Sequence, residues 1–89
     1  MSTFLLIRHK VRDFKFWKHG YDAHRPSRVA AGLTQKSLLR SVADPTEVVL
    51  LFAVKDLRKA RAFVASDDLR EAMQRVGVVD TPSLYFLKG

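Results

Sequence analysis

One eight-residue stretch, residues 47–54 (EVVLLFAV), constrains the fold more than any other part of the chain. It consists almost entirely of β-branched and large apolar residues, which favour a β-strand. Successive side chains of a strand point to opposite faces. Here one face would carry Val48, Leu50, Phe52 and Val54, and the other Val49, Leu51 and Ala53. Because both faces are apolar, we expect this strand to be buried on both sides of a sheet.

The rest of the chain alternates between strand and helix patterns. Asp13 is placed to cap a helix that we expect to run to about Ala31, where Gly32 offers a left-handed stop. Asp56 and Ser66 are placed to cap two shorter helices that follow one another. The predicted order is strand 4–11, helix 14–31, strand 34–43, turn 44–46, strand 47–54, helix 57–65, helix 67–76 and strand 81–88.

This βαββαβ order, with the second helix split in two, predicts a ferredoxin-like α+β domain over residues 1–89. In that arrangement a four-stranded antiparallel sheet carries its helices on one face. The opposite face stays open, although residues 47–54 require burial there. We therefore expect a homodimer in which the sheet of a second subunit covers the open face and completes an α+β barrel.

Composition and charge indicate the cellular compartment of the protein and the kind of partner it could bind. The sequence has 89 residues and no cysteine, which is typical of a reducing compartment. Its longest early apolar run, residues 4–7, is too short to span a membrane. We expect a soluble, cytoplasmic protein without a membrane partner. The net charge of +7 comes from residues 1–40, which favours an anionic partner or a solvated basic face.

The sequence also resembles a known group of proteins along nearly its whole length. The resemblance rests on the Asp44-Pro45 hairpin before the apolar strand, on residues 66–73 (SDDLREAM) and on the link from Gly77 to Pro82. It is similar to small dimeric α+β barrel proteins of the antibiotic biosynthesis monooxygenase-like and cyclase groups. The resemblance implies two ferredoxin-like sheets packed face to face. It also implies activities that range from cofactor-independent oxygenation to isomerisation, cyclisation and haem degradation.

The haem-degrading members of that group use asparagine together with histidine and tryptophan, and some oxygenases also use an asparagine. This sequence contains no asparagine. The resemblance therefore does not carry over the haem chemistry, nor the asparagine-dependent form of the oxygenase chemistry.

The first predicted helix carries the candidate site. At about 100° per residue, Trp17, Tyr21, His24 and Arg28 fall on one stripe that grades from apolar to cationic. We interpret His24 as a candidate general base and Arg28 as the group that holds the resulting anion, so these two are the candidate catalytic residues. Trp17 and Tyr21 would stack on a ligand ring. His9, on the first predicted strand, and Tyr85, on the last, are further candidate ligand-binding residues.

A structural interpretation of the same residues stays open. Trp17 and Tyr21 also fit core or interface aromatics, and His24 and Arg28 fit side chains that bind nearby carbonyls or a partner subunit. His9 fits a satisfied barrel residue, and Tyr85 a packed tyrosine with a bonded hydroxyl. Gly20 and Pro26 weaken the helix, which predicts either a kink near residues 22–26 or a helix that ends and restarts at Pro26.

No cofactor or metal is expected. His19 and His24 point about 140° apart on a helix, and the sequence has no HExxH motif or carboxylate partner that would complete a metal site with them. The sequence has no phosphate-binding or dinucleotide-binding glycine pattern. An RNA-binding ferredoxin-like domain shares the element order, but residues 47–54 lack the basic and aromatic pattern that stacks bases. A homodimer that binds a small aromatic or anionic ligand, a homodimer without a ligand and an RNA-binding domain are the functions considered, in that order.

Overall fold

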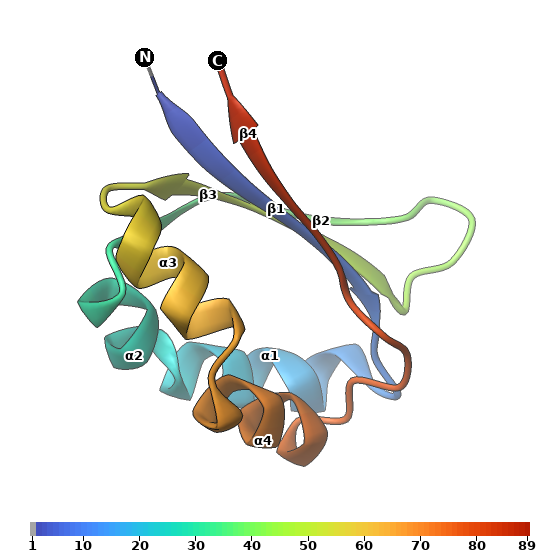
Figure 1. The fold of residues 1–89 in the computed structure, drawn as a ribbon. Helices are drawn as coiled ribbons and strands as arrows, with labels where there is room; N and C mark the ends of the chain where they lie inside the picture. The colour runs from blue at the N-terminus through green and yellow to red at the C-terminus, as the bar shows by residue number, and fades with distance from the viewer. Residues whose placement is uncertain (1) are drawn as a thin grey trace.

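The computed structural model describes residues 2–89 and shows one four-stranded antiparallel sheet with all of its helices on one face (Figure 1). The strand order is β2-β3-β1-β4. The elements are β1 (Thr3–Lys10), α1 (Phe14–Ala23), α2 (Arg25–Ala30), β2 (Leu33–Arg40), β3 (Glu47–Val54), α3 (Leu57–Val64), α4 (Asp67–Arg75) and β4 (Ser83–Lys88). The ferredoxin-like prediction, including the split second helix, is confirmed.

The predicted helix 14–31 is wrong as a single element, because the chain forms two helices, α1 and α2, that meet at His24. Pro26 has no N–H to donate to the carbonyl of Asp22, so a continuous helix would lose a hydrogen bond at that point. In the first turn of α2 the same proline interrupts no helical hydrogen bond. Of the two predicted outcomes, the helix therefore ends and restarts, and it restarts at Arg25, one residue before the proline.

The predicted caps and turns lie where the sequence placed them. The carboxylates of Asp13 and Asp56 and the hydroxyl of Ser66 accept hydrogen bonds from backbone N–H groups of α1, α3 and α4. Gly32 and Gly77 follow α2 and α4 with φ of 77° and 83°, a conformation in which a side chain would be strained. These local signals define where the helices begin and end.

The core lies between the sheet and the helices. Val48, Leu50 and Phe52 of β3 and Leu5 and Ile7 of β1 point to the helices and are buried. The other face of β3 is only partly buried in the single chain. Strand pairing places Leu6 between Leu51 and Tyr85 on this open face, where Leu39, Tyr85 and Leu87 are exposed. The two-sided burial predicted for β3 is thus complete on one face only.

None of the helices among residues 2–89 is both long enough and apolar enough to cross a bilayer.

Candidate functional site

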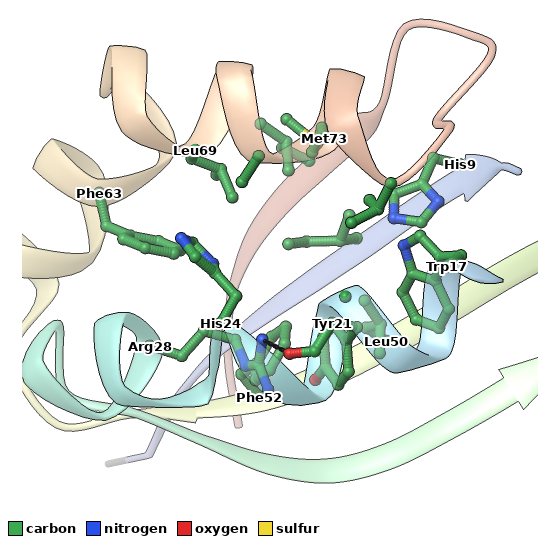
Figure 2. A pocket seen from close by; sticks show the side chains of 15 residues that line it. His9, Trp17, Tyr21, His24, Arg28, Leu50, Phe52, Phe63, Leu69 and Met73 are labelled. Atoms are coloured by element: carbon green, nitrogen blue, oxygen red, sulfur yellow. Dashed lines mark hydrogen bonds between the residues drawn. The ribbon is translucent and has the colours of Figure 1, made fainter. Parts of the chain in front are cut away.

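An apolar cavity of about 60 Å³ lies between α1, the sheet and the pair α3–α4 (Figure 2). Its polar lining residues are His9, Tyr21, His24 and Arg28, and Trp17 and Phe63 are among its aromatic walls. The α1–α2 stripe predicted from the sequence therefore does face a cavity. The break at His24 keeps the stripe on one side, because α2 restarts with Arg28 still turned towards Tyr21.

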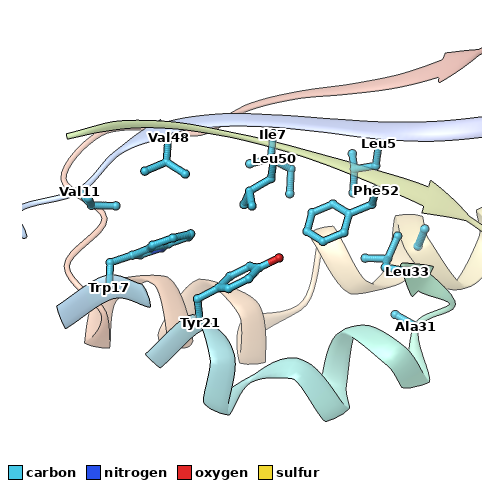
Figure 3. Close-up of a cluster of buried hydrophobic side chains, with 11 residues drawn as sticks. Leu5, Ile7, Val11, Trp17, Tyr21, Ala31, Leu33, Val48, Leu50 and Phe52 are labelled. Atoms are coloured by element: carbon cyan, nitrogen blue, oxygen red, sulfur yellow. The ribbon is translucent and has the colours of Figure 1, made fainter. Parts of the chain in front are cut away.

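Trp17 and Tyr21 form the wall of the cavity on the α1 side. Figure 3 shows both rings between α1 and the core residues of the sheet. The two residues lie one helical turn apart, and their rings stack with centroids 4.8 Å apart. Both are buried beneath the sheet residues of the core. The Tyr21 hydroxyl donates a hydrogen bond to Oε1 of Gln35 at 2.8 Å. Burial raises the pKa of Tyr21 to about 12, so the phenol stays protonated at neutral pH.

Arg28 is a buried cation with no acidic partner. Its side chain is 8% exposed, and no carboxylate within residues 2–89 forms an ion pair with it. Its Nη1 donates to the backbone carbonyl of Tyr21 at 2.7 Å, and its Cζ lies 3.6 Å above the Tyr21 ring. Burial lowers the pKa of Arg28, because removing the guanidinium from water disfavours the charged form.

His24 is positioned by the helix break and by α4. Its Nε2 lies 3.1 Å from Oδ2 of Asp68, and its ring packs against Phe63. An Asp–His pair of this kind fixes the orientation of the imidazole and leaves the other ring nitrogen to act on a ligand. The role of Asp68 was not predicted from the sequence. Its place in the first turn of α4 signalled a helix-dipole contact, and only the tertiary fold brings it to His24.

His9 lies at the opposite end of the cavity from His24 and is 3% exposed. Its ring meets the edge of Trp17, with centroids 5.6 Å apart. Its Nδ1 is buried and has no hydrogen-bond partner within residues 2–89. Burial lowers the pKa of His9, so the imidazole is neutral at neutral pH. An unpartnered buried nitrogen is costly in a native fold, and a ligand hydroxyl would satisfy it.

The helix α4 covers the side of the cavity that faces away from the sheet, and Gly20 determines how closely α4 approaches α1. An added Cβ at position 20 would overlap Cγ1 of Val76, at the end of α4. The glycine that weakens α1 in sequence terms is therefore required by the packing of the two helices. Sequence reasoning recognised the cost of this glycine, but not the residue that requires it.

Comparison with solved structures identifies the fold. A protein of Bordetella bronchiseptica, a proposed antibiotic biosynthesis monooxygenase, matches with a TM-score of 0.76 at 19% identity, over 100% of this chain and 98% of its own. A proposed antibiotic biosynthesis monooxygenase of Nitrosomonas europaea matches with a TM-score of 0.72 at 18% identity, over 99% and 89%. SnoaB, a cofactor-independent oxygenase of Streptomyces nogalater, matches with a TM-score of 0.72 at 12% identity, over 99% and 94%.

This chain has the antibiotic biosynthesis monooxygenase-like fold. No protein-family model matches the sequence, and no curated protein matches it. The likeness is thus one of three-dimensional structure, and at these identities it establishes the fold and nothing more.

Within this fold, one candidate residue lies away from the others. Tyr85 of β4 pairs with Leu6, is 54% exposed and lies on the open face of the sheet. Its neighbour Leu84 lines the cavity instead. Because side chains alternate along a strand, Leu84 and Tyr85 cannot share a face. The structure therefore brings Trp17, Tyr21, His24, Arg28 and His9 together and leaves Tyr85 outside this cavity.

Metal-ligating side chains do not gather at this site: residues 2–89 contain no group of three His, Cys, Asp or Glu side chains with suitable geometry. The polar groups at the cavity are two imidazoles, a guanidinium and a phenol. Such a set can accept a proton and stabilise an anion.

Proposed function

We propose that this protein is a homodimer that binds a small aromatic or anionic organic ligand between α1 and the sheet. We further propose that it acts on this ligand as a cofactor-independent monooxygenase or as a cyclase or isomerase, at a cytoplasmic location. The main support is the set of polar groups around an otherwise apolar cavity, above all the His24–Asp68 pair beside the buried Arg28. The shared fold with SnoaB, a cofactor-independent oxygenase, is consistent with this proposal.

The first chemical step would be removal of a proton from an acidic phenol or enol. His24 would accept the proton at the ring nitrogen that does not face Asp68, and Asp68 would stabilise the imidazolium that forms. Arg28 would stabilise the resulting anion, since its charge is not already neutralised by a carboxylate. Trp17 and Tyr21 would hold the ring of the ligand by stacking.

A monooxygenase reaction would continue at the ring carbon of the deprotonated enol that shares the negative charge and carries one hydrogen, which is a CH₂ group in the keto tautomer. The carbanion form adds to O₂ and, after protonation, gives a hydroperoxide on that carbon. Loss of water from the CH–OOH group then leaves a carbonyl, so that one oxygen atom stays on the ligand and the other leaves as water. If O₂ does not react, reprotonation of the anion at a different carbon gives an isomer. Both routes use the same proton acceptor and the same anion-binding group.

The cavity must enlarge for an aromatic ligand to enter. Its volume of about 60 Å³ has room for a few water molecules, whereas an apolar cavity that binds benzene has roughly 150 Å³. Two contacts hold α4 over the cavity, the His24–Asp68 pair and the packing of Val76 on Gly20. We propose that α3 and α4 move outward together when a ligand binds, because they form the wall opposite the sheet.

The homodimer is proposed from the open face of the sheet. Leu39, Tyr85 and Leu87 are exposed there beside the partly buried side chains of β1 and β3. An exposed apolar sheet face of this kind is a common protein interface. Light scattering should give twice the chain mass for the wild type. Leu39→Asp should shift it towards the monomer, and Phe16→Asp, on the exposed side of α1, should leave the dimer intact.

Ligand binding can be measured through Trp17, the only tryptophan of the chain. A phenol or aromatic acid that enters the cavity should quench or shift its fluorescence saturably. His24→Ala should weaken this response and abolish any ligand-dependent O₂ uptake, whereas His19→Ala removes an exposed histidine of the same helix and should change neither. If no compound of a broad aromatic panel changes the fluorescence of the dimer, the ligand-binding proposal is refuted and a purely structural homodimer is supported.

A further inference from the structure

A second concavity lies on the outer side of α1 and α2, against the edge strand β2. It measures about 570 Å³, within the range of small-molecule sites. The cavity between α1 and the sheet measures about 60 Å³. We call the larger concavity the β2 groove. Its polar lining consists of Lys18, Tyr21, Asp22, Arg25, Arg28 and the β2 pair Thr34 and Gln35.

The charges of the β2 groove are unbalanced. Lys18 and Asp22 neutralise each other, because Nζ lies 2.7 Å from both carboxylate oxygens. Arg25 and Arg28 have no carboxylate partner within residues 2–89. Two guanidinium groups, one exposed and one buried, therefore contribute uncompensated positive charge to one groove.

Of the two unpaired arginines, the buried Arg28 gives the stronger support for an anionic ligand. Buried charges in proteins are normally paired, because burial without a partner is costly. Arg28 uses one N–H on the Tyr21 carbonyl and one face on the Tyr21 ring, while a guanidinium has five N–H donors. Burial lowers the pKa of Arg28, because a guanidinium removed from water is less stable in its charged form.

Neutral donors of the groove lie on β2. Gln35 accepts the Tyr21 hydroxyl through Oε1, so its amide nitrogen is left to donate elsewhere. Thr34 lines the groove as well, but it pairs with Ala53, so its side chain lies on the open face of the sheet, opposite to that of Gln35. β2 is an edge strand, so part of its backbone also lacks a strand partner. The groove thus combines cationic and neutral hydrogen-bond donors with one carboxylate that is already paired.

From these features we infer that the β2 groove is a binding site for the oxyanion group, a carboxylate or a phosphate, of a small organic molecule. The bound oxyanion lies between Arg25 and Arg28 and accepts a hydrogen bond from the amide of Gln35. This site goes beyond the ligand cavity proposed above, since Trp17 and His24 do not line it. Tyr21 and Arg28 line both concavities and form the wall between them.

The experiment is a titration of the ¹⁵N-labelled full chain with sodium phosphate and with sodium acetate, each at constant ionic strength against sodium chloride. We expect saturable amide shifts that cluster around residues 18–35, with at least one of the two anions. The anion that binds more tightly indicates whether the natural ligand carries a phosphate or a carboxylate. Shifts with both anions that do not saturate, or that spread equally over basic residues of α3 and α4, would show only general screening and would overturn the proposal.

Variants make the titration specific. Arg25 is exposed, so Arg25→Gln should fold normally and weaken binding about tenfold or more, as expected for the loss of one charge-assisted hydrogen bond. Lys15→Gln removes an exposed charge from α1 outside the groove and should change binding less than twofold. Equal weakening by the two variants would mean that net charge, not the groove, attracts the anion. Because Arg25 does not line the inner cavity, Arg25→Gln should leave the Trp17 fluorescence response intact.

Discussion

Gly20→Ala tests whether the packing of α4 on α1 is as close as the structure shows. In an exposed helix this change normally stabilises by about 1 kcal/mol, because alanine has the higher helix propensity. Here the new Cβ would overlap Cγ1 of Val76 and lie 3.3 Å from its Cβ. Val76 is β-branched and has few alternative rotamers, so relief requires a shift of α4. Such overpacking costs about 1–3 kcal/mol, which gives a net destabilisation of roughly 0–2 kcal/mol.

The sign of the effect should reverse when Val76 is shortened. In a Val76→Ala background no γ-methyl meets position 20 and only the Cβ at 3.3 Å remains, so Gly20→Ala should stabilise the chain by up to about 1 kcal/mol. The free energy of unfolding of the four proteins, measured by urea denaturation and circular dichroism, forms a double-mutant cycle. We expect a coupling energy of about 1–3 kcal/mol between the two positions. Equal stabilisation by Gly20→Ala in both backgrounds would refute the close contact.

Three further predictions concern other parts of the structure. His9 is buried and its pKa is lowered from the ordinary value of 6.5. At a pH below 6.5 the unfolded state therefore binds a proton at His9 that the folded state excludes. The free energy of unfolding should therefore fall as pH drops below about 6.5, by at most about 1.4 kcal/mol per pH unit, and His9→Gln should remove this contribution in urea titrations at pH 7 and 5.5. Ser66→Ala removes the cap of α4 and should cost about 1 kcal/mol, or 4–8 °C in Tm, by calorimetry. Acid should also weaken the link between β1 and the loop before β4. Burial raises the pKa of Asp80, but hydrogen bonds from the Lys10 backbone and Arg8 outweigh it and lower the pKa below its ordinary value of 3.8. This link should therefore hold above pH 3.8 and be lost only as the pH falls further, through the lowered pKa, as amide exchange of Lys10 would report.

The sequence predicted those parts of the fold that depend on neighbouring residues. Asp13, Asp56 and Ser66 cap their helices because a cap needs only a side-chain oxygen two or three residues before a free N–H. The helix break was foreseen in kind but not in position. A proline forbids continuation of the helix, yet it is tolerated anywhere in the first turn of the next one, so Pro26 alone does not determine the first residue of α2.

The candidate site depended on contacts that no local pattern contains. The stripe on α1 and α2 followed from helical periodicity, and the structure turns it to a cavity. The partner of His24 lies on α4, forty-four residues along the chain, so only packing reveals it. Tyr85 failed to join the site because the register of β4 decides which of two adjacent residues faces the helices. A shift of one residue would exchange Tyr85 and Leu84.

Arg28 shows why the structural and functional interpretations of the stripe need not exclude one another. In a continuous helix the carbonyl of Tyr21 would accept from the N–H of residue 25. At the helix break it accepts instead from the N–H of His24 at 3.2 Å and from Nη1 of Arg28 at 2.7 Å. That role accounts for a hydrogen bond, but a neutral glutamine would also supply one, without the cost of burying a charge. The contact of the guanidinium with the Tyr21 ring offsets only part of that cost, so the fold of the single chain does not fully account for the charge. Because Arg28 faces both the inner cavity and the β2 groove, an anionic ligand in either place would account for it.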